Sequence, residues 1–219
     1  VMYMSRSDDL RSQASMDWTV DDVPDQSGKI GLITGANTGI GYATAKLLAT
    51  RNAFVILGCR NLEKGQSALA RITTDVPQAK VDLLRIDLAS LDSIRKAASD
   101  LASRYQRLDM LVNNAGIMMP PYGLTVDGFE QQFGTNVLGH FLLTGLVLPM
   151  LDRAEAARVI WLSSLAHWNG RIDFDNLNAE KSYSRTGAYA QSKLADLILA
   201  YEMQRRLQRA GSSIVSLGA

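Results

Sequence analysis

The sequence predicts an α/β fold in which a doubly wound parallel sheet carries helices on both faces. Short apolar runs rich in β-branched residues alternate with longer segments of helical periodicity through most of the 219-residue chain. This alternation is typical of strand–helix–strand units, whose parallel strands are buried on both faces and read as nearly continuous apolar runs. We expect the crossovers to be right-handed, as in nearly all such units.

Six runs have the composition expected of strands. They span residues 29–34, 54–59, 81–86, 110–112, 159–162 and 213–217. The amphipathic stretches between them predict helices at residues 40–50, 62–73, 91–104, 129–151 and 188–209. The polar segment 166–186 is rich in turn-forming residues and is predicted to be an insertion with little regular structure. A sheet of this type usually continues through a further crossover after its sixth strand.

The composition is that of a soluble globular protein with one domain. Residues 27–219 are assigned to this domain, and the polar residues 1–26 are predicted to form a flexible or loosely packed extension. The hydrophobic fraction is 47% and the charged fraction 21%, close to ordinary globular usage. The net charge of +1 and the scattered basic residues do not indicate a nucleic-acid partner.

The numbers of cysteines and histidines indicate which covalent and metal sites the chain can form. The single cysteine, Cys59, excludes an intrachain disulfide and fits a reducing compartment, so a cytoplasmic location is expected. With only two histidines, the chain has no zinc-type ligand spacing, and no metal site is predicted. No uninterrupted apolar run reaches 18 residues, so no membrane span is predicted.

A glycine-rich turn follows the first predicted strand and opens directly into a helix. Glycines there allow a tight turn and let an anion approach the backbone, while the free N–H groups and the dipole of the helix favour negative charge. This strand–turn–helix context predicts a pyrophosphate site in a Rossmann-type unit, the alternative being a glycine-rich turn without a ligand. The residues assigned to it are Gly35, Asn37, Thr38, Gly39, Ile40 and Gly41.

The end of the second predicted strand indicates which dinucleotide binds. NAD-binding units usually place a carboxylate about 20 residues after the glycine turn, to hold the ribose 2′-hydroxyl. Here Arg60 stands at the strand end, no acid does, and Glu63 comes one helical turn later. Because a guanidinium can bind a 2′-phosphate bidentately, NADP(H) is predicted over NAD(H). The alternative is that Arg60 is a solvated surface side chain.

Tyr189 and Lys193 are candidates for the chemical step. They are four residues apart in a predicted helix, so both side chains can point into one cleft. A neighbouring ammonium favours the phenolate form of a tyrosine, which makes the phenol useful in acid–base chemistry. A core tyrosine beside a surface lysine would produce the same spacing. The catalytic interpretation of this pair therefore depends on the other polar residues predicted near it.

Other polar residues fall at the carboxyl edge of the predicted sheet, where open α/β sheets bind ligands. Ser163 and Ser164 end the fifth strand, and a hydroxyl there can stabilise charge on a substrate oxygen. The sequence Asn-Asn-Ala-Gly at residues 113–116 ends the fourth strand. Asn136 lies in the following helical stretch and could anchor a proton-relay water through its amide or backbone.

Taken together, these residues resemble the short-chain dehydrogenase/reductase family over residues 29–218. The matching motifs are Thr-Gly-x-x-x-Gly-Ile-Gly at residues 34–41, Asn-Asn-Ala-Gly at 113–116, Asn136, the serine pair at 163–164 and Tyr-x-x-x-Lys at 189–193. The resemblance implies four catalytic roles. Tyr189 would be the acid/base, Ser164 would polarise the carbonyl, Lys193 would hold the ribose hydroxyls and favour the phenolate, and Asn136 would complete a proton relay.

The resemblance also implies cofactor contacts after the third and fourth strands. Asp87 would contact the adenine and Asn114 would lie near the ribose. The full set implied for these two loops is Asp87, Leu88, Asn114, Ala115 and Gly116. In the family, a turn, a mobile substrate lid and a seventh strand follow the sixth strand, and the given chain lacks them.

Within the family, the chain is similar to the retinol dehydrogenase-like and WW-domain oxidoreductase-like branch. The similarity rests on Cys-Arg-Asn at residues 59–61, on residues 136–144 and on Ser-Ser-Leu-Ala-His at 163–167. It implies a preference for NADP(H) and a small apolar carbonyl or alcohol substrate. Because helix 188–209 often forms part of a dimer interface in the family, a homodimer or homotetramer is expected. The membrane anchor of the retinol dehydrogenases has no counterpart at this N-terminus, which counts against a retinoid substrate.

The sequence therefore favours an active NADP(H)-dependent oxidoreductase. The alternatives are an NADP(H)-binding sensor or regulatory protein without turnover, and a membrane-associated lipid-modifying enzyme. A sensor needs no proton relay, so the presence of Asn136, Ser164, Tyr189 and Lys193 favours the enzyme.

Overall fold

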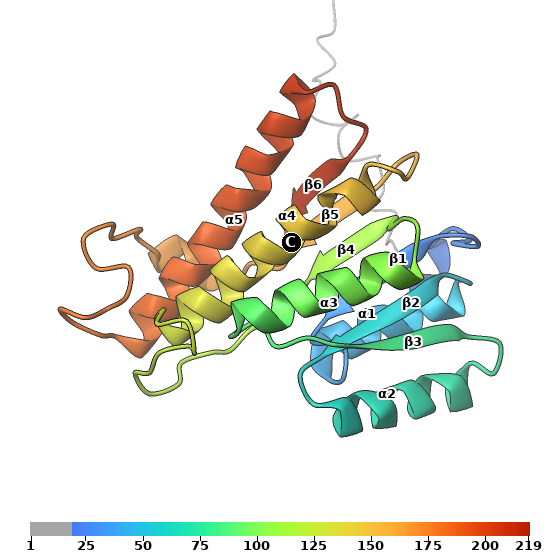
Figure 1. Cartoon of the computed structure of the whole chain (residues 1–219), viewed down its shortest axis with the longest axis horizontal. Helices are drawn as coiled ribbons and strands as arrows, with labels where there is room; N and C mark the ends of the chain where they lie inside the picture. The colour runs from blue at the N-terminus through green and yellow to red at the C-terminus, as the bar shows by residue number, and fades with distance from the viewer. Residues whose placement is uncertain (1–18) are drawn as a thin grey trace, which may run out of the picture.

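The computed structural model describes residues 19–219 and contains a six-stranded sheet in the order β3-β2-β1-β4-β5-β6 (Figure 1). All neighbouring strands are parallel. The strands are β1 (Ile30–Thr34), β2 (Phe54–Cys59), β3 (Lys80–Arg85), β4 (Met110–Asn113), β5 (Arg158–Trp161) and β6 (Val215–Gly218). The predicted fold class, a doubly wound parallel α/β sheet, is confirmed.

Helices cover both faces of this sheet. They are α1 (Gly39–Thr50), α2 (Leu62–Asp75), α3 (Leu91–Arg104), α4 (Gly139–Leu151) and α5 (Arg185–Arg209). Ala45 of α1 and Ala68 of α2 are buried in one apolar cluster, whereas Ile94 of α3, Leu143 of α4 and Ala200 of α5 belong to another. Helices α1 and α2 thus pack on one face and α3, α4 and α5 on the other, with α5 beside β6 and α2 beside β3 (Figure 1).

The strand order places a crevice at the carboxyl ends of β1 and β4. From β1 the chain proceeds outward to β2 and β3, and it then crosses back to β4 on the other side of β1. In register, Gly31 of β1 faces Met110 of β4 and Ile33 faces Val112. The loops that follow β1 and β4 leave in opposite directions at such a switch point, and open sheets of this type bind ligands there.

The predicted strand boundaries and the start of the fourth helix agree with the structure to within two residues. The sequence predicts helix from residue 129, whereas in the structure the helix begins at Gln131, passes through a π-helical turn, η2 (Phe133–Leu138), and continues into α4. The preceding residues form a tight loop, in which the Thr125 N–H donates to the Phe129 carbonyl (2.7 Å) and Gly128 has φ of 82°. Apolar spacing alone could not separate this loop from the helix.

The continuous helix Phe133–Leu151 is, by length and composition, long and apolar enough to cross a bilayer. The sequence prediction of no membrane span rested on the interruption of this apolar stretch by Thr144 and Gly145. Most of the helix is buried inside the fold, with Leu143 and Val147 fully enclosed in the core. That burial is the property of a core helix.

Part of the predicted N-terminal extension packs on the domain. Residues 19–26 contain a 3-10 turn, η1 (Val20–Asp22), and the rest of the extension, residues 1–18, lies outside the described residues. The Gln26 N–H donates to the Arg51 carbonyl (2.7 Å), and the Arg51 guanidinium donates to the Val20 carbonyl (2.8 Å). In the insertion at 166–186, the one regular element is the end of a 3-10 helix, η3 (Leu165–Asn169), before α5 begins at Arg185.

Candidate active site

A cleft of about 750 Å³ opens at the carboxyl ends of β4, β5 and β6. Three of the four residues predicted to be catalytic line it: Ser164, Tyr189 and Lys193. Asn114, Gly116 and Ile40, predicted to contact the cofactor, line the same cleft. The remaining lining is largely apolar: Ile117, Met118, Leu162, Leu165, Leu197 and Tyr201.

A second, smaller cleft of about 220 Å³ adjoins the first at the ends of β1, β2 and β3. Its walls include most of the other residues predicted to bind the cofactor: Gly35, Asn37, Arg60, Asp87, Leu88, Ala115 and Gly116. Gly116 and Ile117 line both clefts, so the two form one groove along the carboxyl edge of the sheet. An extended ligand lying in this groove would reach from Arg60 at one end to Tyr189 at the other.

Two glycines of the glycine turn, Gly35 and Gly41, are packed so closely that a side chain there would displace its neighbours. A Cβ atom on Gly41 would lie 2.4 Å from Nδ2 of Asn114 and 2.6 Å from the Gly35 carbonyl oxygen. Gly35 (φ 67°) and Gly39 (φ 58°) adopt left-handed conformations that favour glycine. Thr38 precedes α1 without capping it through its side chain. The first N–H groups of α1 are thus free of a side-chain cap, as a phosphate-binding turn requires.

Thr34, at the end of β1, joins this turn to β4. Its Oγ1 accepts hydrogen bonds from the N–H groups of Asn114 and Ala115, both at 2.9 Å. The Asn114 amide in turn donates to the Thr34 carbonyl (2.7 Å). The side chain of Asn114, predicted to lie near the ribose, therefore holds the ends of β1 and β4 together while it also borders the cleft.

The two serines after β5 have different partners. The Ser163 hydroxyl donates to the Lys193 carbonyl in α5 (2.8 Å), so its proton is already used in packing. The Ser164 Oγ accepts from the Ala166 N–H at 3.2 Å, which leaves its own proton available to a ligand in the cleft. This difference supports the assignment of Ser164, rather than Ser163, to the substrate oxygen.

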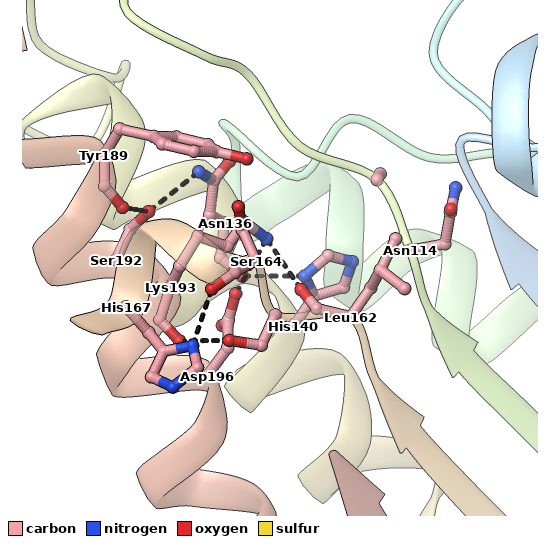
Figure 2. Close-up of polar contacts among 12 residues, drawn as sticks. Asn114, Asn136, His140, Leu162, Ser164, His167, Tyr189, Ser192, Lys193 and Asp196 are labelled. Carbon is pink, nitrogen blue, oxygen red and sulfur yellow. Dashed lines mark hydrogen bonds and ion pairs between the residues drawn. The ribbon is translucent and has the colours of Figure 1, made fainter. Parts of the chain in front are cut away.

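Tyr189 and Lys193 lie in the second and third turns of α5, and the N-cap residue Ser184 accepts from the Gly187 N–H (3.2 Å). Figure 2 shows their side chains gathered with those of Asn136 and Ser164, whereas Asn114 lies apart on the other side of the group. The Lys193 ammonium donates to the Leu162 carbonyl at 2.7 Å and to Asp196 at 3.0 Å. These two bonds fix the ammonium at the base of the cleft.

Asn136 does not line the cleft and has little free hydrogen-bonding capacity. Its amide brackets Ile117, accepting from the Ile117 N–H (2.9 Å) and donating to the Ile117 carbonyl (3.0 Å), and it also donates to Ser192 Oγ (3.0 Å). Its backbone carbonyl accepts from His140 Nδ1 (2.7 Å). In this structure Asn136 positions the floor of the groove, and its amide is not free to hold a relay water.

His140 is a packed, neutral histidine. Because the Asn136 carbonyl can only accept, Nδ1 carries the proton, and Nε2 accepts from the Thr34 hydroxyl (2.8 Å). Burial lowers the pKa of His140 to about 4. Cys59 is likewise enclosed, and burial raises the pKa of its thiol to about 11, which makes it a poor nucleophile.

Sequence reasoning missed two groups of lining residues. Lys64, in the first turn of α2, lines the smaller cleft with Arg60, and its position four residues after Arg60 was the available signal. Leu197 and Tyr201 continue the four-residue spacing of Tyr189 and Lys193 along α5, so one helical stripe lines the larger cleft. That stripe is also visible in the sequence, where it is easily taken for ordinary core.

The fold and the groove are those of a Rossmann-type α/β protein, and the comparisons with known proteins identify its family. Residues 29–217 match the short chain dehydrogenase family, and the chain belongs to that family. Within it, the chain is 48% identical to human retinol dehydrogenase 13 over 191 residues, covering 87% of this chain and 58% of that protein. Mouse retinol dehydrogenase 11 is 46% identical over 190 residues, covering 87% of this chain and 60% of the relative. The predicted retinol dehydrogenase-like branch is confirmed, although the chain spans only about 60% of these relatives' length.

Solved structures show the same relationship. A protein from Mycobacterium paratuberculosis superimposes with a TM-score of 0.83 at 46% identity, covering 92% of this chain and 70% of that one. A short chain dehydrogenase from Shigella flexneri, complexed with NADP, has a TM-score of 0.70 at 25% identity and covers 89% and 76% of the two chains.

Proposed function

We propose that this chain is an NADP(H)-dependent oxidoreductase that transfers a hydride between the nicotinamide and the carbonyl or alcohol carbon of a small apolar substrate. The observation that carries the proposal is the placement of Ser164, Tyr189 and Lys193 in one cleft that continues into the groove of the glycine turn. Hydride chemistry needs a proton donor and a charge-stabilising group beside the nucleotide, and this arrangement provides both.

The protein's own residues would handle the proton and the developing charge. When bound, NADPH supplies the hydride to a carbonyl carbon, or NADP+ accepts it from an alcohol. In the reductive direction, the Tyr189 hydroxyl gives its proton to the substrate oxygen, and it takes that proton back in oxidation. The Ser164 hydroxyl donates a hydrogen bond to the same oxygen. The Lys193 ammonium, fixed at the base of the cleft, favours the phenolate form of Tyr189 and would bind the ribose hydroxyls.

Two cations support a preference for NADP(H). Arg60 and Lys64 are both exposed and line the smaller cleft, whose only carboxylate is Asp87 within the described residues. Asp87 is engaged by the Ala89 N–H (3.0 Å). A guanidinium and an ammonium together favour a 2′-phosphate over a 2′-hydroxyl. The NADP named with the Shigella flexneri structure is consistent with this preference.

The wall of the larger cleft supports an apolar substrate. Met118, Leu165 and Tyr201 are large apolar or aromatic side chains with more than half their surface exposed, at 66%, 79% and 70%. Exposed apolar surface of this extent around a groove marks a binding site for an apolar partner. Apolar aldehydes and the corresponding alcohols fit this wall, and the related retinol dehydrogenases are named for an apolar alcohol.

The assembly state and location belong to the same proposal. Phe141 and Leu146 of α4 are exposed and line an apolar hollow of about 550 Å³ between α4 and α5, and Ile198 of α5 is also exposed. We propose that this face joins two copies into a homodimer, which can pair further into a tetramer, and that the protein works in the cytoplasm. Phe141→Glu is expected to convert the assembly to monomers in sedimentation measurements.

Turnover measurements test the proposed chemistry. Purified protein is given NADPH and a series of straight-chain and aromatic aldehydes, and NADPH consumption is followed by absorbance. Tyr189→Phe is expected to reduce kcat at least about a thousandfold, because the proton donor is lost, while NADPH affinity is retained. Tyr201→Phe removes a hydroxyl from the same cleft and serves as the control. Equal turnover in Tyr189→Phe and the native protein would contradict the assignment, and NADPH binding with no turnover would favour a sensor.

A further inference from the structure

Asp196 is a buried carboxylate next to Tyr189 and Lys193, and it has no role in the proposed proton and hydride transfer. It lies three residues after Lys193 on α5, and its Oδ2 accepts from the Lys193 ammonium at 3.0 Å. The two side chains are only 3% and 6% exposed. The other oxygen, Oδ1, is buried and has no hydrogen-bond partner among residues 19–219.

Lys193 is the only charged group that bonds to Asp196 in the described part of the chain. The elements packed against α5 bring two other titratable side chains, His167 of η3 and Arg158 of β5, while η2 and β6 carry none. His167 contacts the Ser164 carbonyl (2.6 Å), and Arg158 donates to carbonyls at the opposite end of β5. His140 of α4 lies near Lys193 and is neutral.

We propose that Asp196 is a positioning residue that fixes the Lys193 ammonium against β5 and offsets its charge, and so sets the pH at which Tyr189 gains or loses its proton. The Leu162 carbonyl and Asp196 together use two of the three N–H bonds of the ammonium. The third has no hydrogen-bond partner among residues 19–219, and Lys193 lines the cleft. The catalytic role of Asp196 rests on the proposed function, whereas the effect on the ionisation of Tyr189 can be measured without turnover.

The buried charges of Lys193 and Asp196 have opposite effects on the ionisation of Tyr189. A positive charge near Tyr189 favours its phenolate, and a carboxylate beside that positive charge weakens the effect. Burial raises the pKa of Asp196 to about 7, while Lys193 acts in the opposite direction. The charges of Asp196 and Lys193 therefore depend on each other, and the influence of Lys193 on the tyrosine changes with the charge of Asp196.

The ionisation of Tyr189 can be followed without turnover. Tyrosinate absorbance is recorded against pH, and the curve of the matching Tyr189→Phe protein is subtracted from that of each variant. Asp196→Asn is expected to move the midpoint to lower pH by about one unit, because the uncompensated ammonium favours the phenolate more strongly. Glu202→Gln removes a carboxylate from the outer side of the same helix and should leave the midpoint unchanged. If Asp196→Asn does not fold, Asp196→Ser removes the same charge and should give the same displacement.

A second comparison tests whether Asp196 acts through Lys193. In a Lys193→Met background, Asp196→Asn should displace the midpoint less, since the ammonium through which Asp196 acts is absent. An unchanged or raised midpoint in Asp196→Asn, or an equal displacement in both backgrounds, would overturn the proposal. If the displacement appears but the native protein reduces no carbonyl compound, the inference holds and the proposed function fails.

Discussion

The Nε2 atom of His140 lies 2.8 Å from the hydroxyl of Thr34, although 106 residues separate them in the chain. The contact joins α4 to the end of β1, and Thr34 is the residue whose hydroxyl also receives the N–H groups of Asn114 and Ala115. Through Nδ1 the same imidazole holds the carbonyl of Asn136. One neutral ring thus connects the glycine turn, the loop after β4 and the π-helical turn that carries Asn136.

This relationship predicts a stability that depends on pH. Burial lowers the pKa of His140 to about 4 from 6.5. Below about pH 6.5, His140 is protonated in the unfolded chain but stays neutral in the folded protein. The stabilisation that depends on neutral His140 is therefore complete above pH 6.5 and is lost as the pH falls toward 4. The loss amounts to about 3 kcal/mol. His140→Asn cannot titrate, so the stability difference between the native protein and this variant, from urea unfolding, should shrink over that range. A difference independent of pH would contradict the neutral assignment.

Gly41 is predicted to be indispensable for nucleotide binding. A methyl group there would meet the Asn114 amide and the Gly35 carbonyl well inside van der Waals contact, so the turn must shift. Gly41→Ala should weaken NADPH affinity at least about tenfold, which is about 1.4 kcal/mol. Gly145→Ala is the matched control, because a Cβ at that helical position meets nothing within 4 Å. The control should gain about 0.5–1 kcal/mol in stability and bind NADPH normally. Equal affinities in the two variants would show that the turn does not hold the phosphates.

Asn136 is predicted to act chiefly through structure. Asn136→Ala removes three buried hydrogen bonds and leaves the Ile117 N–H and carbonyl without partners. The expected loss is about 3 kcal/mol in the free energy of unfolding, with reduced turnover because the groove floor is displaced. Asn169→Ala, at an exposed position, serves as the control. A variant that keeps its stability but loses turnover would instead place Asn136 in the reaction itself.

The sequence predicted the elements that depend on local pattern. Continuous apolar runs mark buried parallel strands whatever their neighbours, and residues 54–59 and 91–104 were assigned with the bounds that the structure has. The site was also predictable to a large degree, because the carboxyl ends of parallel strands meet at one edge. Ser164 and Gly116, 48 positions apart, therefore line the same cleft.

Other features depend on contacts that no local pattern encodes. The loop before the helix that starts at Gln131 is closed by the Thr125 N–H and has Gly128 in a left-handed conformation. The bracket that Asn136 forms around Ile117 joins residues 19 positions apart. Asp196 reads as one polar residue on an amphipathic helix, and only the packed structure shows that its carboxylate is enclosed with Lys193.

The most direct test of the central claim is a titration of the protein with NADPH and with NADH, followed by nucleotide fluorescence. NADPH is expected to bind at least about tenfold more tightly than NADH, since Arg60 and Lys64 would hold the 2′-phosphate. Arg60→Asp should reverse this preference, and Lys64→Ala should weaken NADPH alone, with Lys96→Ala on the distant helix α3 as the control. Equal affinity for the two nucleotides, unchanged by Arg60→Asp, would contradict the NADP(H) assignment, and failure to bind either would contradict the nucleotide site itself.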